Sequence, residues 1–165
     1  MESSLIKFFA IVRKSGECYL SISFEKDLDE TLIGGLITAI FSFGTTSLNQ
    51  QLSKMSVESD KFSIESFTHE YNKNKSLIAV AMISKSLNKK EFNIFSEKIL
   101  KEFTNRYNSK LENFDGEVSC FEPFREELID QIKEEFGSNK DNFQNKLDDI
   151  FNQITDGDLS GLDRL

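Results

Sequence analysis

The run SLIAVAMIS, residues 76–84, is apolar on both faces and carries no charged side chain. A short, uninterrupted apolar run with β-branched residues is typical of a strand that is covered on both sides. The run LIKFFAIVR, residues 5–13, has a similar character. We therefore expect these two segments to be neighbouring central strands of one sheet, with helices on its faces.

The first central strand leads directly into a second strand. After residues 5–13 the sequence KSGE (14–17) has turn chemistry, and Gly16 can take a positive φ there. The segment CYLSISFE (18–25) alternates polar and apolar residues, as a half-buried strand does. The two segments therefore predict a β-hairpin.

A second group of strands precedes and includes the other central run. Residues 52–59 and 62–71 both alternate between apolar and polar side chains, and residues 76–84 follow them. The connections are short and have turn chemistry, so we expect an antiparallel meander of three strands. Residues 18–25 and 52–59 should then be the two edges of a five-stranded sheet.

The stretch DETLIGGLITAIFSFGTT, residues 29–46, separates the two groups of strands and predicts a helix over residues 28–46. Asp27 or Asp29 can cap its N-terminus. Its apolar residues cover more than one stripe, which indicates wide burial. Gly44 should lie near the C-terminal cap.

Two adjacent glycines, Gly34 and Gly35, lie in the first turns of this helix. Each costs about 1 kcal/mol relative to alanine in a helix interior. Without side chains they allow another backbone to approach the helix closely, either its own sheet or a partner. Of the two interpretations we favour the first, in which the glycines seat the helix on its own sheet.

Two amphipathic helices follow the meander. Asn88 is a candidate N-cap for KKEFNIFSEKILKEFTNRYNSKL (89–111), whose aromatic and aliphatic residues form one stripe. The segment CFEPFREELIDQIKEEFG (120–137) has Pro123 in its first turn and should end at Gly137.

The sequence divides into a domain at residues 1–137 and a C-terminal segment at residues 138–165. Residues 139–154 predict a short amphipathic helix, followed by a frayed tail. The apolar stripe of this helix consists of Phe143, Leu147, Ile150, Phe151 and Ile154. A helix this short is marginal in water, so the stripe requires a surface to pack against. It can fold back on its own domain, which we favour, or enter a groove on another chain.

The fold class that follows is α/β, of the α+β type. We expect a five-stranded antiparallel sheet with the element order β-β-α-β-β-β-α-α and a short C-terminal helix. The formal net charge of −8 disfavours binding to nucleic acid or to anionic lipid. We expect Cys18 and Cys120 to be reduced and buried. With no signal-peptide pattern and no membrane span in the sequence, we expect a cytoplasmic protein.

No sequence pattern of a catalytic site is present. The chain has no GxxxxGK[ST] phosphate-binding loop, no GxSxG, no HExxH and no paired CxxC. Its single histidine, His69, cannot form a His-rich metal site and is expected to be structural. Arg125 and Arg164 stand isolated, so no arginine is marked as a catalytic group. We expect no enzyme activity, no cofactor and no metal site.

The order of these elements resembles longin domains and the related roadblock-type domains. The resemblance covers about residues 5–136 and rests on FFAIVRKSGECYLSISF, LIGGLITAIFSFG, SLIAVAMIS and the helices EFNIFSEKILKEFTNRY and FEPFREELIDQIKEEF. It is strongest to the stand-alone longin proteins of Asgard archaea. The tail differs from that of longin SNAREs, because it lacks a long heptad segment and a membrane anchor.

The resemblance implies a platform for small GTPases, or for other longin- or roadblock-type proteins, in trafficking or signalling. An alternative is a structural subunit that forms a homodimer without binding a GTPase. Longin and roadblock dimers pair through an edge strand or the first helix, which makes these the candidate surfaces. The candidate interface residues are Gly34, Gly35, Lys54, Met55, Val57, Phe143, Leu147 and Phe151.

Overall fold

The computed structural model describes residues 4–48, 56–137, 147, 148, 150–152 and 154. Its elements follow the expected order along the chain. They are β1 (Ile6–Arg13), β2 (Cys18–Ser23), α1 (Glu30–Ser47), β3 (Ser56–Glu58), β4 (Phe62–Asn72), β5 (Lys75–Ser84), α2 (Lys89–Glu112), the 3-10 turn η1 (Ser119–Phe121) and α3 (Glu122–Phe136).

The strands form one five-stranded antiparallel sheet in the order β2-β1-β5-β4-β3. The two doubly apolar strands, β1 and β5, are neighbours at its centre, and Phe9 lies opposite Ala81. β2 and β3 form the edges. The expected sheet, its central pair and both edges are thus confirmed.

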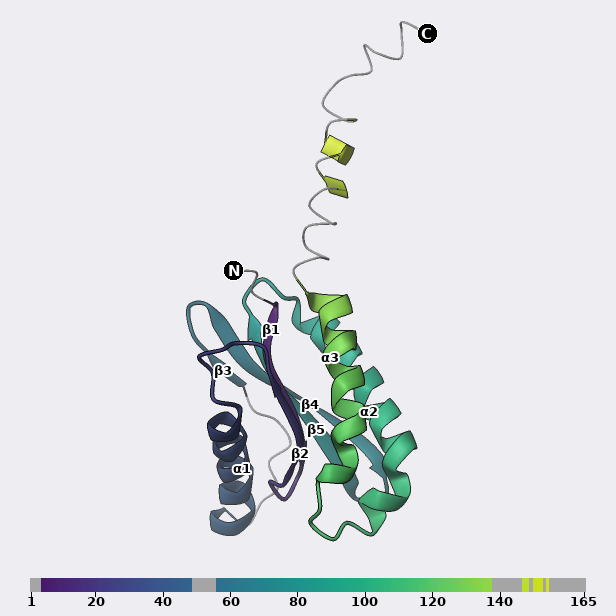
Figure 1. Cartoon of the computed structure of the whole chain (residues 1–165). Helices are drawn as coiled ribbons and strands as arrows, with labels where there is room; N and C mark the ends of the chain where they lie inside the picture. Colours follow the sequence, from purple (N-terminus) through teal and green to yellow (C-terminus); the bar gives the residue numbers. More distant parts are fainter. Residues whose placement is uncertain (1–3, 49–55, 138–146, 149, 153, 155–165) are drawn as a thin grey trace, which may run out of the picture.

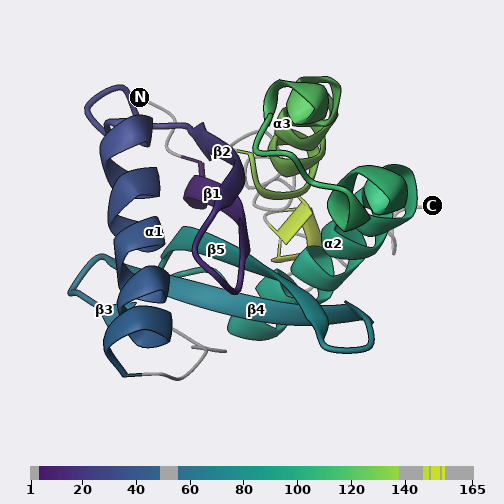
Figure 2. The ribbon, with the colours of Figure 1, turned by 90° about the horizontal axis from the view of Figure 1, so that it is seen from below.

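The molecule has three layers. Figures 1 and 2 show α1 alone on one face of the sheet, and α2 and α3 side by side on the other. Asp29 caps α1 by accepting a hydrogen bond from the Leu32 N–H, and Asn88 caps α2 by accepting one from the Lys90 N–H. Pro123 lies in the first turn of α3, and α3 ends at Gly137 as expected.

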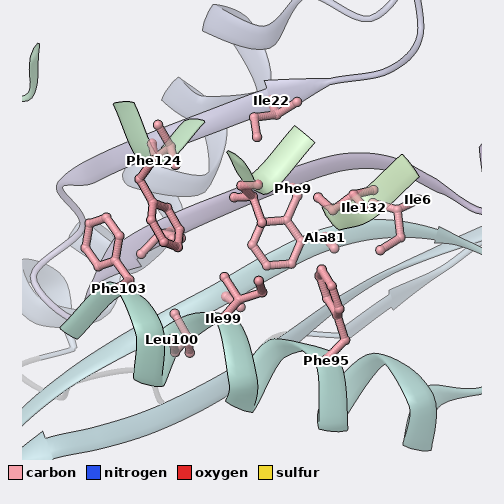
Figure 3. Close-up of a cluster of buried hydrophobic side chains, with 14 of the residues drawn as sticks. Ile6, Phe9, Ile22, Ala81, Phe95, Ile99, Leu100, Phe103, Phe124 and Ile132 are labelled. Atoms are coloured by element: carbon pink, nitrogen blue, oxygen red, sulfur yellow. The ribbon is translucent and has the colours of Figure 1, made fainter. Parts of the chain in front are cut away.

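The larger part of the core lies between the sheet and the helices α2 and α3. Figure 3 shows Phe9 of β1 facing Phe95 and Ile99 of α2, with Phe124 and Ile132 contributed by α3. The rings of Phe9 and Phe95 meet edge to face, with their centroids 6.1 Å apart. This aromatic core holds α2, α3 and the sheet together as one body.

The core under α1 is smaller. Ile37 and Phe41 of α1 are buried against the other face of β1 and β5, where Phe8, Ala10 and Val80 lie. The alternation of the strands therefore separates two apolar clusters, one on each face of the sheet.

The structure corrects one boundary. Gly44 is not near the C-terminal cap of α1, because the helix continues to Ser47 and is capped by Leu48. Gly44 is instead buried, seven residues after Ile37 and three after Phe41, on the same side of the helix as these two residues. The glycine therefore belongs to the interior of the helix, on its buried side.

The C-terminal stripe behaves differently from the favoured expectation. Residues 147, 148, 150–152 and 154 are helical, and Leu147 is half-buried. Ile150, Phe151 and Ile154 each expose half or more of their surface. At these three positions the exposed fractions contradict the expectation that the stripe folds back and packs on its own domain. Phe143 lies outside the described residues.

Candidate functional site

The outward side of α1 is apolar and uncharged. We call Leu32, Leu36 and Phe43 the outer face of α1; they are 73%, 57% and 56% exposed. After Glu30 the helix carries no charged residue as far as Ser47. Exposed apolar side chains that gather on one element typically mark an interaction surface.

The local sequence explains why these side chains point outward. Ile37 and Phe41 lie four residues apart and occupy the side of α1 that contacts the sheet. Leu36 and Phe43 fall on the opposite side of the helix. Beside Leu32 and Leu36 lies a shallow hollow of about 570 Å³, whose floor includes Gly35. The outer face therefore combines large side chains with a neighbouring depression.

A second depression runs along the outer edge of β2. We call it the β2 groove; it has a volume of about 400 Å³. β2 contributes its floor, α1 contributes one wall, and Val118 and α3 contribute the other. Its lining residues include Ser21, Glu30, Gly34, Thr38, Glu122 and Arg125. Its size falls within the range of ordinary ligand pockets.

The backbone of β2 presents hydrogen-bonding groups to this groove. Phe24 donates its backbone N–H to the Lys7 carbonyl. The backbone N–H and carbonyl groups of even-numbered residues at this end of the hairpin therefore point toward β1, and those of odd-numbered residues point away from it. Ser21 and Ser23 therefore face the groove. The Ser23 N–H donates to Glu30 Oε2 at 3.3 Å. The side chain of Glu30 thus takes the place that a neighbouring strand's carbonyl would occupy.

Glu30 also connects the two walls of the groove. Arg125 Nη2 of α3 lies 3.1 Å from Glu30 Oε2 of α1, although the residues are far apart in sequence. The Ser21 hydroxyl donates to Glu30 Oε1 at 3.2 Å. Both charged side chains are about one-third exposed. This ion pair bridges the edge of the sheet at one end of the groove.

The predicted glycine pair lies at these two depressions. A Cβ atom added to Gly34 would meet only the Ser21 Oγ, at 3.9 Å, and a Cβ atom added to Gly35 would meet nothing within 4 Å. The described residues therefore do not require glycine at either position for α1 to rest on its sheet. The favoured interpretation, that both glycines seat the helix, finds no support in this geometry.

The other candidate interface residues are scattered. Val57 lies on the edge strand β3 and is exposed. Leu147 and Phe151 belong to the helical C-terminal residues, half-buried and exposed respectively. Lys54, Met55 and Phe143 lie outside the described residues. Among the described candidates, Gly34 and Gly35 lie at one surface of α1, whereas Val57, Leu147 and Phe151 belong to other elements.

Burial shifts the pKa values of several groups on β2 and β4, of which Cys18, Tyr19 and His69 are examples. It raises the pKa of the Cys18 thiol and raises the pKa of Tyr19 to about 12. It lowers the pKa of His69, and the nearby Lys101 ammonium adds to this shift. Each shift favours the neutral form of its group, as expected for partly desolvated structural residues.

No cluster of three or more potential metal-ligating side chains occurs in the described part of the chain. None of the described helices is long and apolar enough to cross a membrane. The expectations of no enzyme activity, no cofactor and a cytoplasmic location remain predictions.

Sequence reasoning missed the groove because its charged groups come from distant elements. From the sequence alone, Glu30 is interpreted as an acidic residue that favours a helix N-terminus, and Arg125 is interpreted as an isolated surface charge. Only the packing of α1 and α3 on opposite faces of the sheet brings the two together at the edge of β2. The one signal in the sequence was the unexplained glycine pair.

Fold and site together define a three-layer α+β protein with an exposed apolar helix and an open sheet edge. No protein-family model matches the sequence, and no curated protein sequence matches it. Among solved structures, MglB of Myxococcus xanthus is similar, with a TM-score of 0.47 and 16% sequence identity over 63% of this chain and 85% of MglB. The sheet order β2-β1-β5-β4-β3 and the placement of the three long helices define the fold of this chain.

Proposed function

We propose that this chain is a non-catalytic protein-interaction module whose partner docks on the outer face of α1. The observation that carries the proposal is the exposure of Leu32, Leu36 and Phe43 on a helix that has no charge after Glu30. Burying a leucine or phenylalanine side chain contributes about 1.5–3 kcal/mol. A partner that covers these three side chains would therefore gain a substantial apolar contact.

The partner class follows from the longin-like order of the elements. We propose a small GTPase, or another longin- or roadblock-type protein, in a trafficking or signalling complex. The chain lacks a phosphate-binding loop of its own, so the nucleotide would be held by the partner. Self-association through the same face is the second candidate, because a face without charge does not repel its own copy.

The experiment is a pull-down of the full chain against small GTPases of the same genome, loaded with GTP or with GDP. Leu36→Glu places a charge in the centre of the outer face and should abolish capture. Ile94→Glu is the matched control, since Ile94 on α2 is similarly exposed, at 60%. Equal capture by both variants would contradict docking on this face.

Sedimentation of the same proteins separates the two candidates. If the second candidate holds, the wild-type chain sediments as a dimer and Leu36→Glu as a monomer. A monomeric wild type that captures no GTPase and no longin- or roadblock-type protein would overturn the proposal.

A further inference from the structure

The outer edge of β2 retains backbone groups that no described residue satisfies. Ser21 faces away from β1, and its N–H and carbonyl point into the β2 groove. We propose that this groove binds an extended peptide segment of a partner protein, which pairs with β2 as an additional strand. The site differs from the outer face of α1, so it is independent of the proposed function.

The wall formed by α1 suits a peptide backbone. A strand added beside β2 would lie about 4.8 Å from it and would run past Gly34 and Thr38. Because Gly34 has no side chain, the wall is flat beside Ser21. A Cβ atom added to Gly34 would lie 3.9 Å from Ser21 Oγ, at the outer limit of van der Waals contact. Glycine at such a position allows another backbone to approach closely. This role accounts for a glycine that the helix and its own sheet do not require.

The ion pair limits the shape of the occupant. Glu30 and Arg125 meet across the edge of β2, so α1 and α3 approach each other beyond the strand. The edge of a second folded sheet carries its own helical layers and would collide with these walls. A single extended segment carries no such layers, and we therefore take it as the occupant of the groove, whose volume is about 400 Å³.

The charges of the groove indicate the chemistry of the segment. Glu30 and Arg125 neutralise each other, which leaves the carboxylate of Glu122 on the wall formed by α3. The whole chain carries a net charge of −8. We therefore assign the groove to a segment that is uncharged where it faces α1 and carries a lysine or arginine near Glu122.

An edge strand can also be protected by a charged side chain against unwanted pairing. Glu30 would protect the edge of β2 in this way, because its carboxylate accepts the hydrogen bond of the Ser23 N–H. The two roles lead to different outcomes. A protecting carboxylate predicts that no peptide binds the wild-type chain, whereas a binding groove predicts specific strand pairing at Ser21.

The test is a selection of phage-displayed random peptides on the full wild-type chain. Enriched peptides are synthesised, and their affinity is measured for wild type, Gly34→Leu, Gly34→Ala and Leu36→Glu. Filling the wall with Gly34→Leu should weaken binding by about tenfold or more, which is about 1.4 kcal/mol. Gly34→Ala should weaken it less, and Leu36→Glu should leave it unchanged.

Two further readouts identify strand pairing. Hydrogen exchange of the Ser21 amide should slow when peptide is added, and N-methylation of alternate peptide amides should abolish binding. If Gly34→Leu does not fold, the peptide affinity of Gly34→Ala and the hydrogen exchange of the Ser21 amide still test whether the peptide pairs with β2. The proposal is overturned if no peptide is enriched on the wild type, or if enriched peptides bind the Gly34 variants equally well. It is also overturned if they leave Ser21 unprotected.

Discussion

Two glycine sites of this molecule have opposite surroundings. Gly16, in the turn between β1 and β2, has a φ of +106°, and an added Cβ would lie 2.9 Å from the Thr38 carbonyl oxygen of α1. In the same turn, the Ser15 carbonyl accepts a hydrogen bond from the Ser42 hydroxyl of α1. Gly34 has ordinary helical geometry, and its added Cβ would have room.

The difference shows that a glycine can be present in a sequence for two unrelated physical reasons. At Gly16 the fold itself requires the absence of a side chain, because the turn is pressed against α1. At Gly34 and Gly35 the helix loses stability without an intramolecular gain. A glycine whose surroundings are open therefore directs attention to what approaches from outside.

The largest expected effect is that of Gly16→Ala. The substitution introduces both a strained positive φ and a clash with α1, so it should destabilise the fold by about 2–3 kcal/mol. Urea unfolding measures this as a lower transition midpoint. Gly116→Ala is the control, because Gly116 also has a positive φ, +97°, but its added Cβ would meet nothing within 4 Å. Equal losses in the two variants would show that the contact with α1 contributes nothing.

Substitutions at the open pair should act in the opposite direction. Gly34→Ala and Gly35→Ala each remove the helix penalty of glycine and should stabilise the protein by about 0.5–1 kcal/mol. Thermal unfolding followed by circular dichroism should show a higher midpoint for each variant and a roughly additive gain for the double variant. A loss of stability at Gly34 would mean that α1 rests on β2 more tightly than the geometry indicates.

The ion pair that connects the two walls of the β2 groove should matter less to stability. Glu30→Gln removes the charge that joins Arg125 to the Ser23 N–H. Because both side chains are about one-third exposed and partly screened, we expect a loss of at most about 1 kcal/mol. A double-mutant cycle with Arg125→Met isolates the pair. A coupling well above this value would make the pair a structural clamp between α1 and α3.

The smallest expected effect is the pH dependence of stability that arises from His69. This residue lies on β4, away from the glycines of α1, and therefore serves as a control. Burial and Lys101 lower its pKa in the folded protein, while Glu97 opposes the shift. The stability from the neutral imidazole is therefore complete above the ordinary histidine pKa of about 6.5 and is lost as the pH falls through the folded value. An NMR titration should give a midpoint below 6.5 that Gly34→Ala does not change. A midpoint at or above 6.5 would contradict the burial of this side chain.

The sequence was most informative where local chemistry determines the structure. The doubly apolar runs identified β1 and β5, and the caps Asp29 and Asn88 follow from rules that act within one turn. The prediction for Gly44 was wrong because a glycine near a helix end resembles a cap, whereas here it is a buried residue inside the helix.

The groove could not be predicted in the same way. The contact between Glu30 and Arg125 depends on how two helices pack on opposite faces of one sheet, which no local pattern encodes. For the same reason the apolar run of the first helix predicted wide burial, although its outer face is exposed. The sequence pattern gives the amount of apolar surface but not which part of it lacks a neighbour.

The unequal division of the core has a consequence for how the molecule opens. α1 is held by a few buried side chains such as Ile37 and Phe41, whereas α2 and α3 share the large aromatic cluster. A layer with fewer buried contacts separates at a lower free energy than the rest of a domain. In the native ensemble, α1 should therefore detach as a cooperative unit while the sheet and the other helices stay intact. Amide protons of α1 should then exchange by this partial opening, and those of β1 and β5 only by global unfolding.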